Sequence, residues 1–161
     1  MNGLSYFAIR LVCFSICLPS TQLDLKKPKG VVEQLIHAVD SRNLAITSKL
    51  YKPRTVGGKK LPPAKDLFAA SDYITKSSVT QAVAVNAKLV YVEYLIDAYR
   101  KKNHRLVLEI KMVAEVSKFP NGEWRVTVAA TDAAKVDVSK WFPDKKRWNH
   151  SKYLELHRRK Q

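Results

Sequence analysis

The amino-acid sequence predicts an α+β domain in which N-terminal helices pack on one face of a curved antiparallel sheet. Apolar residues recur at helical spacing in the first half of the chain, and they alternate with polar residues from residue 75 onward. The chain has 161 residues, of which 46% are hydrophobic. This length and composition fit one domain with a hydrophobic core and exclude a largely disordered chain.

The first twenty residues resemble a secretory signal peptide, because Arg10 precedes an apolar stretch over residues 11–18. We therefore expect residues 1–20 to be removed and the mature protein to be secreted; a buried N-terminal helix is the alternative. Both cysteines, Cys13 and Cys17, would leave with the peptide, which would exclude disulfide and cysteine–metal chemistry afterwards. No apolar run reaches the ~18 residues that a transmembrane helix needs.

Helical periodicity defines the next elements. After a flexible lead-in over residues 21–30, a first helix is predicted by apolar residues at helical spacing: Val32, Leu35, Ile36 and Val39. Asp40 is expected to cap the corner that follows. A second helix is predicted over residues 44–51 and a third short one over residues 66–74, with the least structured stretch, residues 52–65, between them.

Four strand-like segments follow, in which apolar and polar residues alternate: 79–87, 90–98, 106–116 and 124–130. In the second of them Tyr94 shares a face with the apolar residues, while Asp97 lies on the other face. Asn121-Gly122 between the last two segments is a strong hairpin signal, because Asn-Gly tolerates the positive φ of a tight turn. The domain is therefore expected to span residues 31–138, followed by a basic tail over residues 139–161.

The segment from Ile36 to Pro53 resembles the opening of nuclear transport factor 2-like (cystatin-like cone) domains, with matching positions at Asp40, Leu44, Leu50, Tyr51 and Pro53. Such domains begin with an amphipathic helix, a polar corner containing Asp, and a second helix before a proline. The resemblance covers about residues 30–132 and implies a cone-shaped sheet around the first helix, enclosing an apolar pocket. Members include isomerases, dehydratases, transport factors and non-catalytic modules; this chain looks most like the secreted members without assigned activity.

An enzyme on this scaffold would need an acid or a base that faces the pocket. The candidates are His37, Tyr94 and Asp97, with Asp40 and Asp72 behind them. Strand alternation predicts that Asp97 faces away from the pocket, and helical spacing places His37 beside the apolar stripe of its helix. We therefore expect a non-catalytic binding or interaction module whose ligand is unknown. A small-molecule isomerase or hydratase in the cone pocket is an alternative.

No metal ion or cofactor is predicted, because the histidines are spread along the chain without partners at ligand spacing: His37, His104, His150 and His157. The Gly57-Gly58-Lys59-Lys60 element lacks the pattern of a phosphate-binding loop. Residues 81–85, Gln-Ala-Val-Ala-Val, resemble the Gln-Val-Val-Ala-Gly hairpin with which cystatins block cysteine proteases. Val85 replaces the glycine that lets that hairpin turn, so we expect this segment to lie in mid-strand.

The net charge of +15 collects in loops and in the tail. Positive clusters beside aromatic residues can bind polyanions, with an affinity that falls as salt rises. Extracellular binding of glycosaminoglycan, anionic lipid or nucleic acid is therefore an alternative function, and a solvated basic surface is the competing explanation. The residues assigned to polyanion binding are Lys59, Lys60, Arg100, Lys101, Lys102, Lys145, Lys146, Arg147, Arg158 and Arg159.

Two further predictions concern the surface. Asn149 lies in the sequence Asn-His-Ser, which is a glycosylation sequon on the secretory route. A homodimer through the sheet is expected because the face opposite the helices would expose Tyr91, Leu95, Val107 and Val113.

Overall fold

A computed structural model describes residues 23–130, 136–142 and 156 of the chain. Several predictions of the sequence lie outside the described residues: the signal peptide, the glycosylation site Asn149, and the tail cations Lys145, Lys146, Arg147, Arg158 and Arg159.

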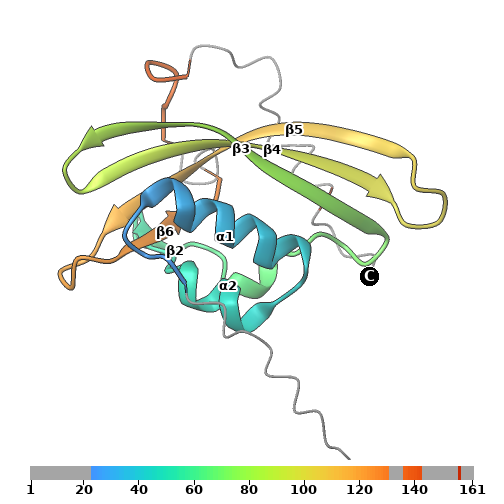
Figure 1. The fold of residues 1–161 in the computed structure, drawn as a ribbon, viewed down its shortest axis with the longest axis horizontal. Coiled ribbons are helices and arrows are strands. Elements are labelled where there is room, and N and C mark those ends of the chain that lie inside the picture. Colours follow the sequence, from blue (N-terminus) through green and yellow to red (C-terminus); the bar gives the residue numbers. More distant parts are fainter. Residues whose placement is uncertain (1–22, 131–135, 143–155, 157–161) are drawn as a thin grey trace, which may run out of the picture.

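In the described part of the chain, helices lie under one face of a curved antiparallel sheet (Figure 1). The helices are α1 (Pro28–Asp40) and α2 (Leu44–Leu50). The sheet has the order β3-β4-β5-β6, with β3 at Tyr73–Asn86, β4 at Leu89–Arg100, β5 at Leu106–Lys118 and β6 at Trp124–Val128. The predicted α+β class is confirmed. No helix among these residues is long and apolar enough to cross a membrane.

Helix α1 buries one apolar stripe against the concave face of the sheet, namely Val31, Val32, Leu35, Ile36 and Ala38. It begins at Pro28, inside the expected flexible lead-in, because the fixed φ of proline suits the first turn of a helix. The residues before the helix are also held, since the Trp124 N–H donates to the Leu25 carbonyl at 2.9 Å.

Asn43 caps the corner between the two helices. Its side-chain oxygen accepts the Ile46 N–H at 3.1 Å, which satisfies one of the open donors at the start of α2. Arg42 turns the chain with a left-handed φ of 56°. The prediction that Asp40 caps this corner is wrong, because its carboxylate binds β3 instead.

Residues 52–65 contain a small hairpin where we expected the least structure. Strand β1 (Thr55–Val56) pairs with β2 (Lys59–Lys60) across Gly57-Gly58, whose φ values are +54° and +77°. Glycine adopts these left-handed conformations without the steric cost that a side chain would add. The two glycines that indicated a loop are therefore the turn of a hairpin.

The third helix predicted over residues 66–74 is wrong. The chain forms only a 3₁₀ turn, η1 (Ala64–Leu67), and Tyr73 already belongs to β3. A helix this short would leave most of its end groups without hydrogen bonds, whereas pairing with β4 satisfies them along a long ladder.

Strand β3 changes face at a bulge, because its register against β4 shifts between Val79 and Gln81. Val79 packs against the core beside α1, whereas Val83 and Val85 pack on the opposite face of the sheet. The alternation in the sequence predicts one shared face, but an extra residue inverts the alternation beyond the bulge. Residues 81–85 lie inside β3 and not in a turn, as expected, but they are near its end, because β3 ends at Asn86.

Residues 136–142 cover part of the outer, convex face of the sheet. Val138 and Phe142 are each 1% exposed there, and they belong to a second core cluster with Tyr91. The Trp141 ring meets the Tyr91 ring edge-on, with 5.1 Å between ring centroids. The boundary expected between the domain and a basic tail therefore falls inside a packed segment.

Residues 136–142 help to bury two of the four side chains on which the predicted dimer through the sheet depends. Tyr91 and Val113, both expected to be exposed, are buried within the monomer. Leu95 is half-buried, and Val107 is 39% exposed. Dimerisation through the remaining sheet surface stays a prediction.

Candidate functional site

A small cavity lies between α1 and the concave face of the sheet, where the resemblance implied a pocket. It encloses about 30 Å³ of free space. Its apolar walls come from α1, the sheet and the loop after η1, and they include Val32, Leu35, Ile36, Val39, Leu67, Ile96, Ala114 and Leu156. Its polar lining consists of Asp40, Thr75, Ser77 and Tyr94.

Asp40 is the carboxylate of this cavity, and both of its oxygens accept hydrogen bonds from β3. The Thr75 hydroxyl donates to Oδ1 at 2.6 Å, and the Ser77 hydroxyl donates to the same atom at 3.0 Å. The Ser77 backbone N–H donates to Oδ2 at 2.7 Å. The end of α1 is therefore fastened to the edge strand by a carboxylate that is already occupied by donors.

Tyr94 is the phenol of the cavity, and it projects from β4 toward the helices. It is 6% exposed, and its hydroxyl donates to the Ala129 carbonyl at 2.6 Å. Leu156 closes the cavity from another side, since it is 2% exposed and its carbonyl accepts the Ala70 N–H at 3.0 Å. The hydroxyl thus has a structural role at the rim of the core.

The size of the cavity limits its chemistry. A water molecule needs about 10–15 Å³ of such space, so the cavity holds about two waters rather than an organic substrate. An acid–base catalyst must also hold a lone pair or proton toward its substrate, and Asp40 directs its oxygens to Thr75 and Ser77. The arrangement is that of a polar anchor inside a packed cone.

The other sequence candidates do not line the cavity. His37 is exposed on the outer side of α1, as its position beside the apolar stripe indicated. Asp97 lies on the convex face of β4, opposite the buried Ile96 and Ala98, with Lys76 as its cross-strand neighbour on β3. Its Oδ1 is buried without a hydrogen-bond partner among the described residues. Asp72 is exposed just before β3.

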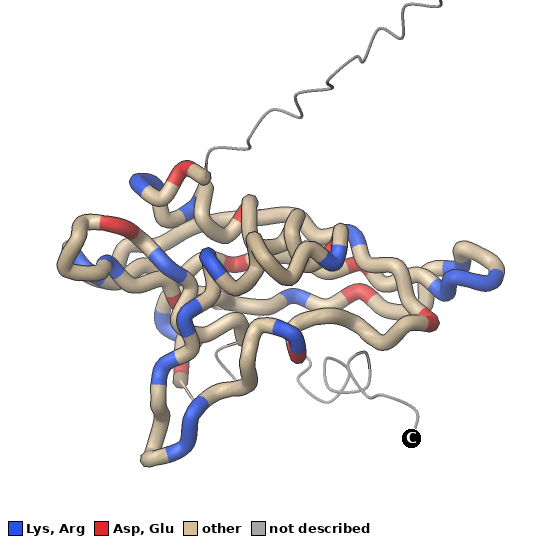
Figure 2. Tube along the Cα trace, turned by 90° about the horizontal axis from the view of Figure 1, so that it is seen from below, with Lys and Arg blue, Asp and Glu red and all other residues tan. Residues whose placement is uncertain are grey.

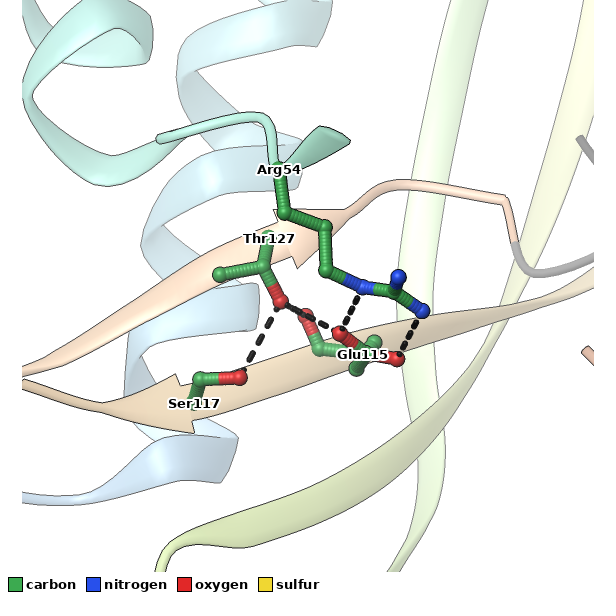
Figure 3. Close-up of polar contacts among 4 residues, drawn as sticks. All are labelled: Arg54, Glu115, Ser117 and Thr127. Carbon is green, nitrogen blue, oxygen red and sulfur yellow. Dashed lines mark hydrogen bonds and ion pairs between the residues drawn. The ribbon is translucent and has the colours of Figure 1, made fainter. Parts of the chain in front are cut away.

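A polar cluster that the sequence did not predict lies on the convex face (Figure 3). Arg54 forms a two-pronged ion pair with Glu115, with Nε to Oε1 at 2.7 Å and Nη2 to Oε2 at 3.0 Å. The Thr127 hydroxyl donates to Glu115 Oε1 at 2.8 Å and also contacts the Ser117 hydroxyl at 3.2 Å. The Glu115 hydrogen bond raises the pKa of the Arg54 guanidinium above its ordinary value, while burial opposes that rise.

This cluster ties the segment that leads into the β1–β2 hairpin to the sheet. The Arg54 N–H donates to the Thr127 carbonyl at 3.2 Å, and the Lys52 N–H donates to the Val126 carbonyl at 2.8 Å. Tyr91 lies near the cluster; burial raises its pKa, and the charge of Glu115 raises it further. With both charges paired, the cluster has the character of a structural anchor rather than of a catalytic site.

A second buried carboxylate, Glu93, lies on the same face of β4. It is 2% exposed, and its Oε1 accepts hydrogen bonds from the Thr80 hydroxyl at 2.7 Å and from the Gln81 side-chain amide at 3.3 Å. Lys111 Nζ lies 3.6 Å from the same oxygen. Strand alternation alone predicts a solvent-facing glutamate here. The partners become apparent only when β3 and β5 are placed on either side of it.

The exposed cations gather at the turn between β4 and β5. Arg100, Lys101, Lys102 and Arg105 are all exposed, and none of them forms an ion pair within the described residues. The turn forms one end of the sheet, and it is the blue loop at the right-hand end of the molecule in Figure 2. Sequence analysis assigned the first three of these residues to polyanion binding, and the structure adds Arg105 beside them.

The other described cations assigned to polyanion binding, Lys59 and Lys60, are exposed on the β1–β2 hairpin. In the part of the chain that the structure describes, no cluster of three His, Cys, Asp or Glu side chains could hold a metal ion. Of the two described sets of cations assigned to polyanion binding, the one in the β4–β5 turn is the larger.

No family model matches the chain, and no curated protein matches it. Among solved structures, the chain is similar to a ketosteroid isomerase-like protein from Erwinia carotovora atroseptica, with 12% identity over 64% of this chain and 90% of that one and a TM-score of 0.49. It is also similar to a domain of unknown function with a cystatin-like fold from Nostoc punctiforme, with 12% identity over 80% and 88% of the two chains and a TM-score of 0.48. The nuclear transport factor 2-like superfamily stays a prediction of the sequence, since these likenesses have low identities and TM-scores below 0.5.

Proposed function

We propose that this chain is an exported, non-catalytic binding module that acts through its outer surface rather than through the interior of the cone. The observation that carries the proposal is the state of Asp40, whose two oxygens accept three hydrogen bonds from Thr75 and Ser77. A carboxylate that accepts three hydrogen bonds from its own chain, beside about 30 Å³ of free space, is suited to hold the fold rather than to take a proton from a substrate.

The ligand class that the surface supports best is a polyanion. The cations of the β4–β5 turn are exposed and have no carboxylate partner among the described residues, so their charge is available to a ligand. Lys59 and Lys60 would add to the attraction, although their hairpin is a separate element. Binding by such groups weakens steeply with salt, because it depends on releasing counterions.

Heparin chromatography of the full chain tests this proposal. The variant Lys101→Glu/Lys102→Glu should elute at a clearly lower salt concentration than the wild type. The matched control is Lys49→Glu/Lys88→Glu, which makes the same change in net charge at exposed positions on α2 and at the other end of the sheet. Equal elution of the two variants would show that only net charge matters and would remove the β4–β5 turn from the proposal.

A proton-transfer enzyme, such as an isomerase or hydratase, is the second candidate, because Asp40 and Tyr94 both line the cone. Its test is isomerisation of a ketosteroid, the substrate class for which one similar structure is named. We expect no rate above the buffer reaction, since Asp40 is engaged by its own chain. A rate that Asp40→Asn abolishes, with the fold intact by circular dichroism, would replace the binding module with an enzyme.

A further inference from the structure

Exposed apolar side chains lie directly beside the cations of the β4–β5 turn. Leu106 is 47% exposed and Val107 is 39% exposed, and both belong to the small group of large hydrophobic residues that the described surface exposes. The register between β4 and β5 shifts at this end of the ladder, so that Val107 has no cross-strand partner. A purely electrostatic surface would not need these apolar residues.

The cations and the apolar residues line one hollow. Arg100, Asn103 and Arg105 form its polar side, and Leu106 and Val107 form its apolar side, around an open volume of about 370 Å³. Each guanidinium presents a planar fork of donors that matches two oxygens of a phosphate. The hollow therefore joins phosphate-binding groups to an apolar edge.

Hydrogen bonds within the turn hold this arrangement. The His104 N–H donates to the Arg100 carbonyl at 2.8 Å, and the Arg100 N–H donates to the Arg105 carbonyl at 2.9 Å. The Arg105 N–H donates to the Asn103 side chain at 3.2 Å, and His104 takes a left-handed φ of 51°. The side chains that a ligand would meet thus project from a fixed backbone.

Acidic residues near the turn reduce its charge without cancelling it. Asp72 lies at its base, where the Asp72 carbonyl accepts the Lys101 N–H at 2.9 Å, and Glu109 follows on β5. Both acids are exposed. The cations of the turn outnumber these two carboxylates.

We propose that the β4–β5 turn docks on an anionic phospholipid membrane. The inference rests on the polyanion binding proposed above and names the polyanion. The Arg and Lys side chains contact the lipid phosphates, while Leu106 and Val107 enter the boundary between headgroups and acyl chains. The position of the turn at one end of the molecule lets it reach a flat surface without hindrance from the helices (Figure 1).

The apolar pair favours a membrane over the other polyanions. A glycosaminoglycan has no hydrocarbon that would bury Leu106 and Val107. A nucleic acid duplex would bind through its phosphates and leave the apolar pair in water. A single strand would stack its bases on aromatic side chains, and the aromatic residue closest in sequence to the turn, Tyr99, lies beneath the Lys76 ammonium at 5.5 Å. Only a lipid surface offers phosphates and an apolar layer together.

Sedimentation of the full chain with vesicles tests the proposal. Vesicles of phosphatidylcholine alone should bind weakly, and vesicles that also contain phosphatidylserine should bind well. Lys101→Glu/Lys102→Glu should weaken binding to the anionic vesicles by at least about 30-fold, because each cation near such a surface contributes about fivefold in affinity and two cations are lost. Leu106→Ser/Val107→Ser should weaken it by about tenfold and leave heparin elution unchanged.

The controls are Lys49→Glu/Lys88→Glu for charge and Leu44→Ser for an exposed leucine elsewhere, since Leu44 is also 47% exposed. Both should bind vesicles like the wild type. If Leu106→Ser/Val107→Ser binds vesicles as tightly as the wild type while the charge variant does not, the membrane inference fails and polyanion binding stands. If the charge variant loses neither heparin nor vesicle binding, both proposals fail. Thermal unfolding of each variant confirms that its fold is intact.

Discussion

At the scale of single residues, Asp40 shows how the three-dimensional contacts redefine a side chain. Its place after an apolar stripe, before Ser41 and Arg42, is typical of a residue that caps a corner. Those local neighbours do not reveal Thr75 and Ser77, which lie more than thirty positions later and supply all three of its hydrogen bonds. Asp40 is therefore a tertiary anchor between α1 and β3.

Replacing Asp40 by Asn should destabilise the protein by about 2 kcal/mol, because an amide cannot accept at both positions and turns a donor toward a hydroxyl or an N–H. Denaturant unfolding measures this loss. The matched control is Glu33→Gln, which removes an exposed carboxylate from the same helix and a loose contact with Lys29 at 3.7 Å. It should cost less than about 0.5 kcal/mol. Equal costs for the two variants would contradict the anchor.

The pair of Arg54 and Glu115 leads to a second prediction. The Glu115 side chain is only 6% exposed, so Arg54→Ala leaves a buried carboxylate with the Thr127 hydroxyl as its remaining side-chain donor. We expect a loss of about 2 kcal/mol in unfolding free energy. In a Glu115→Gln background the same change should cost under about 1 kcal/mol. A double-mutant cycle with no coupling would show that the two charges do not stabilise each other.

Tyr51 gives the protein a dependence on alkaline pH. Burial raises its pKa from the ordinary value of 10.0 to about 12. The folded state thus resists losing the proton that the unfolded state releases, and stability is full below about pH 10 and falls as the pH rises toward 12. Between pH 9 and pH 11 this group should cost about 1 kcal/mol. In denaturant titrations at pH 9 and pH 11, the unfolding free energy of Tyr51→Phe should fall less with pH than that of the wild type. An equal fall in both proteins would contradict this role of Tyr51.

At the scale of elements, the sequence predicts a helix or a strand wherever its period is long and regular. Helix α1 and strands β4, β5 and β6 follow from apolar spacing and from the Asn121-Gly122 turn, where Gly122 has a φ of 82°. The third helix fails because residues 66–74 are too short a segment for apolar spacing to separate a helix from the start of a strand. The bulge after Val79 cannot be predicted, since an extra residue leaves no local signature in the alternation.

Residues 136–142 provide a test at this scale, because they turn an expected tail into part of the domain. Phe142 is 1% exposed, so Phe142→Ala should cost about 3 kcal/mol through the cavity that it leaves over the convex face. The control is Phe119→Ala in the β5–β6 turn, where the ring is 37% exposed and its removal should stay within about 0.5 kcal/mol. Chemical unfolding of both variants measures the difference. If Phe142→Ala lowers the unfolding free energy as little as Phe119→Ala does, residues 136–142 are a loosely attached tail and not part of the domain.

At the scale of the whole molecule, the sequence locates the charge but not its surroundings. The run from Arg100 to Arg105 is visible in the sequence as a basic turn. Its combination with the exposed Leu106 and Val107 in one hollow needs the three-dimensional turn. The engagement of Asp40 by β3 likewise depends on contacts that no spacing in the sequence encodes.

The central claim is that the protein binds through its surface and uses Asp40 only to hold the fold. The most direct test is the salt concentration at which the full chain elutes from heparin, measured for Lys101→Glu/Lys102→Glu and for Asp40→Asn beside the wild type. At a temperature where both variants are folded, Lys101→Glu/Lys102→Glu should elute at a much lower salt concentration, and Asp40→Asn should elute like the wild type. Wild-type elution of the turn variant would contradict the central claim.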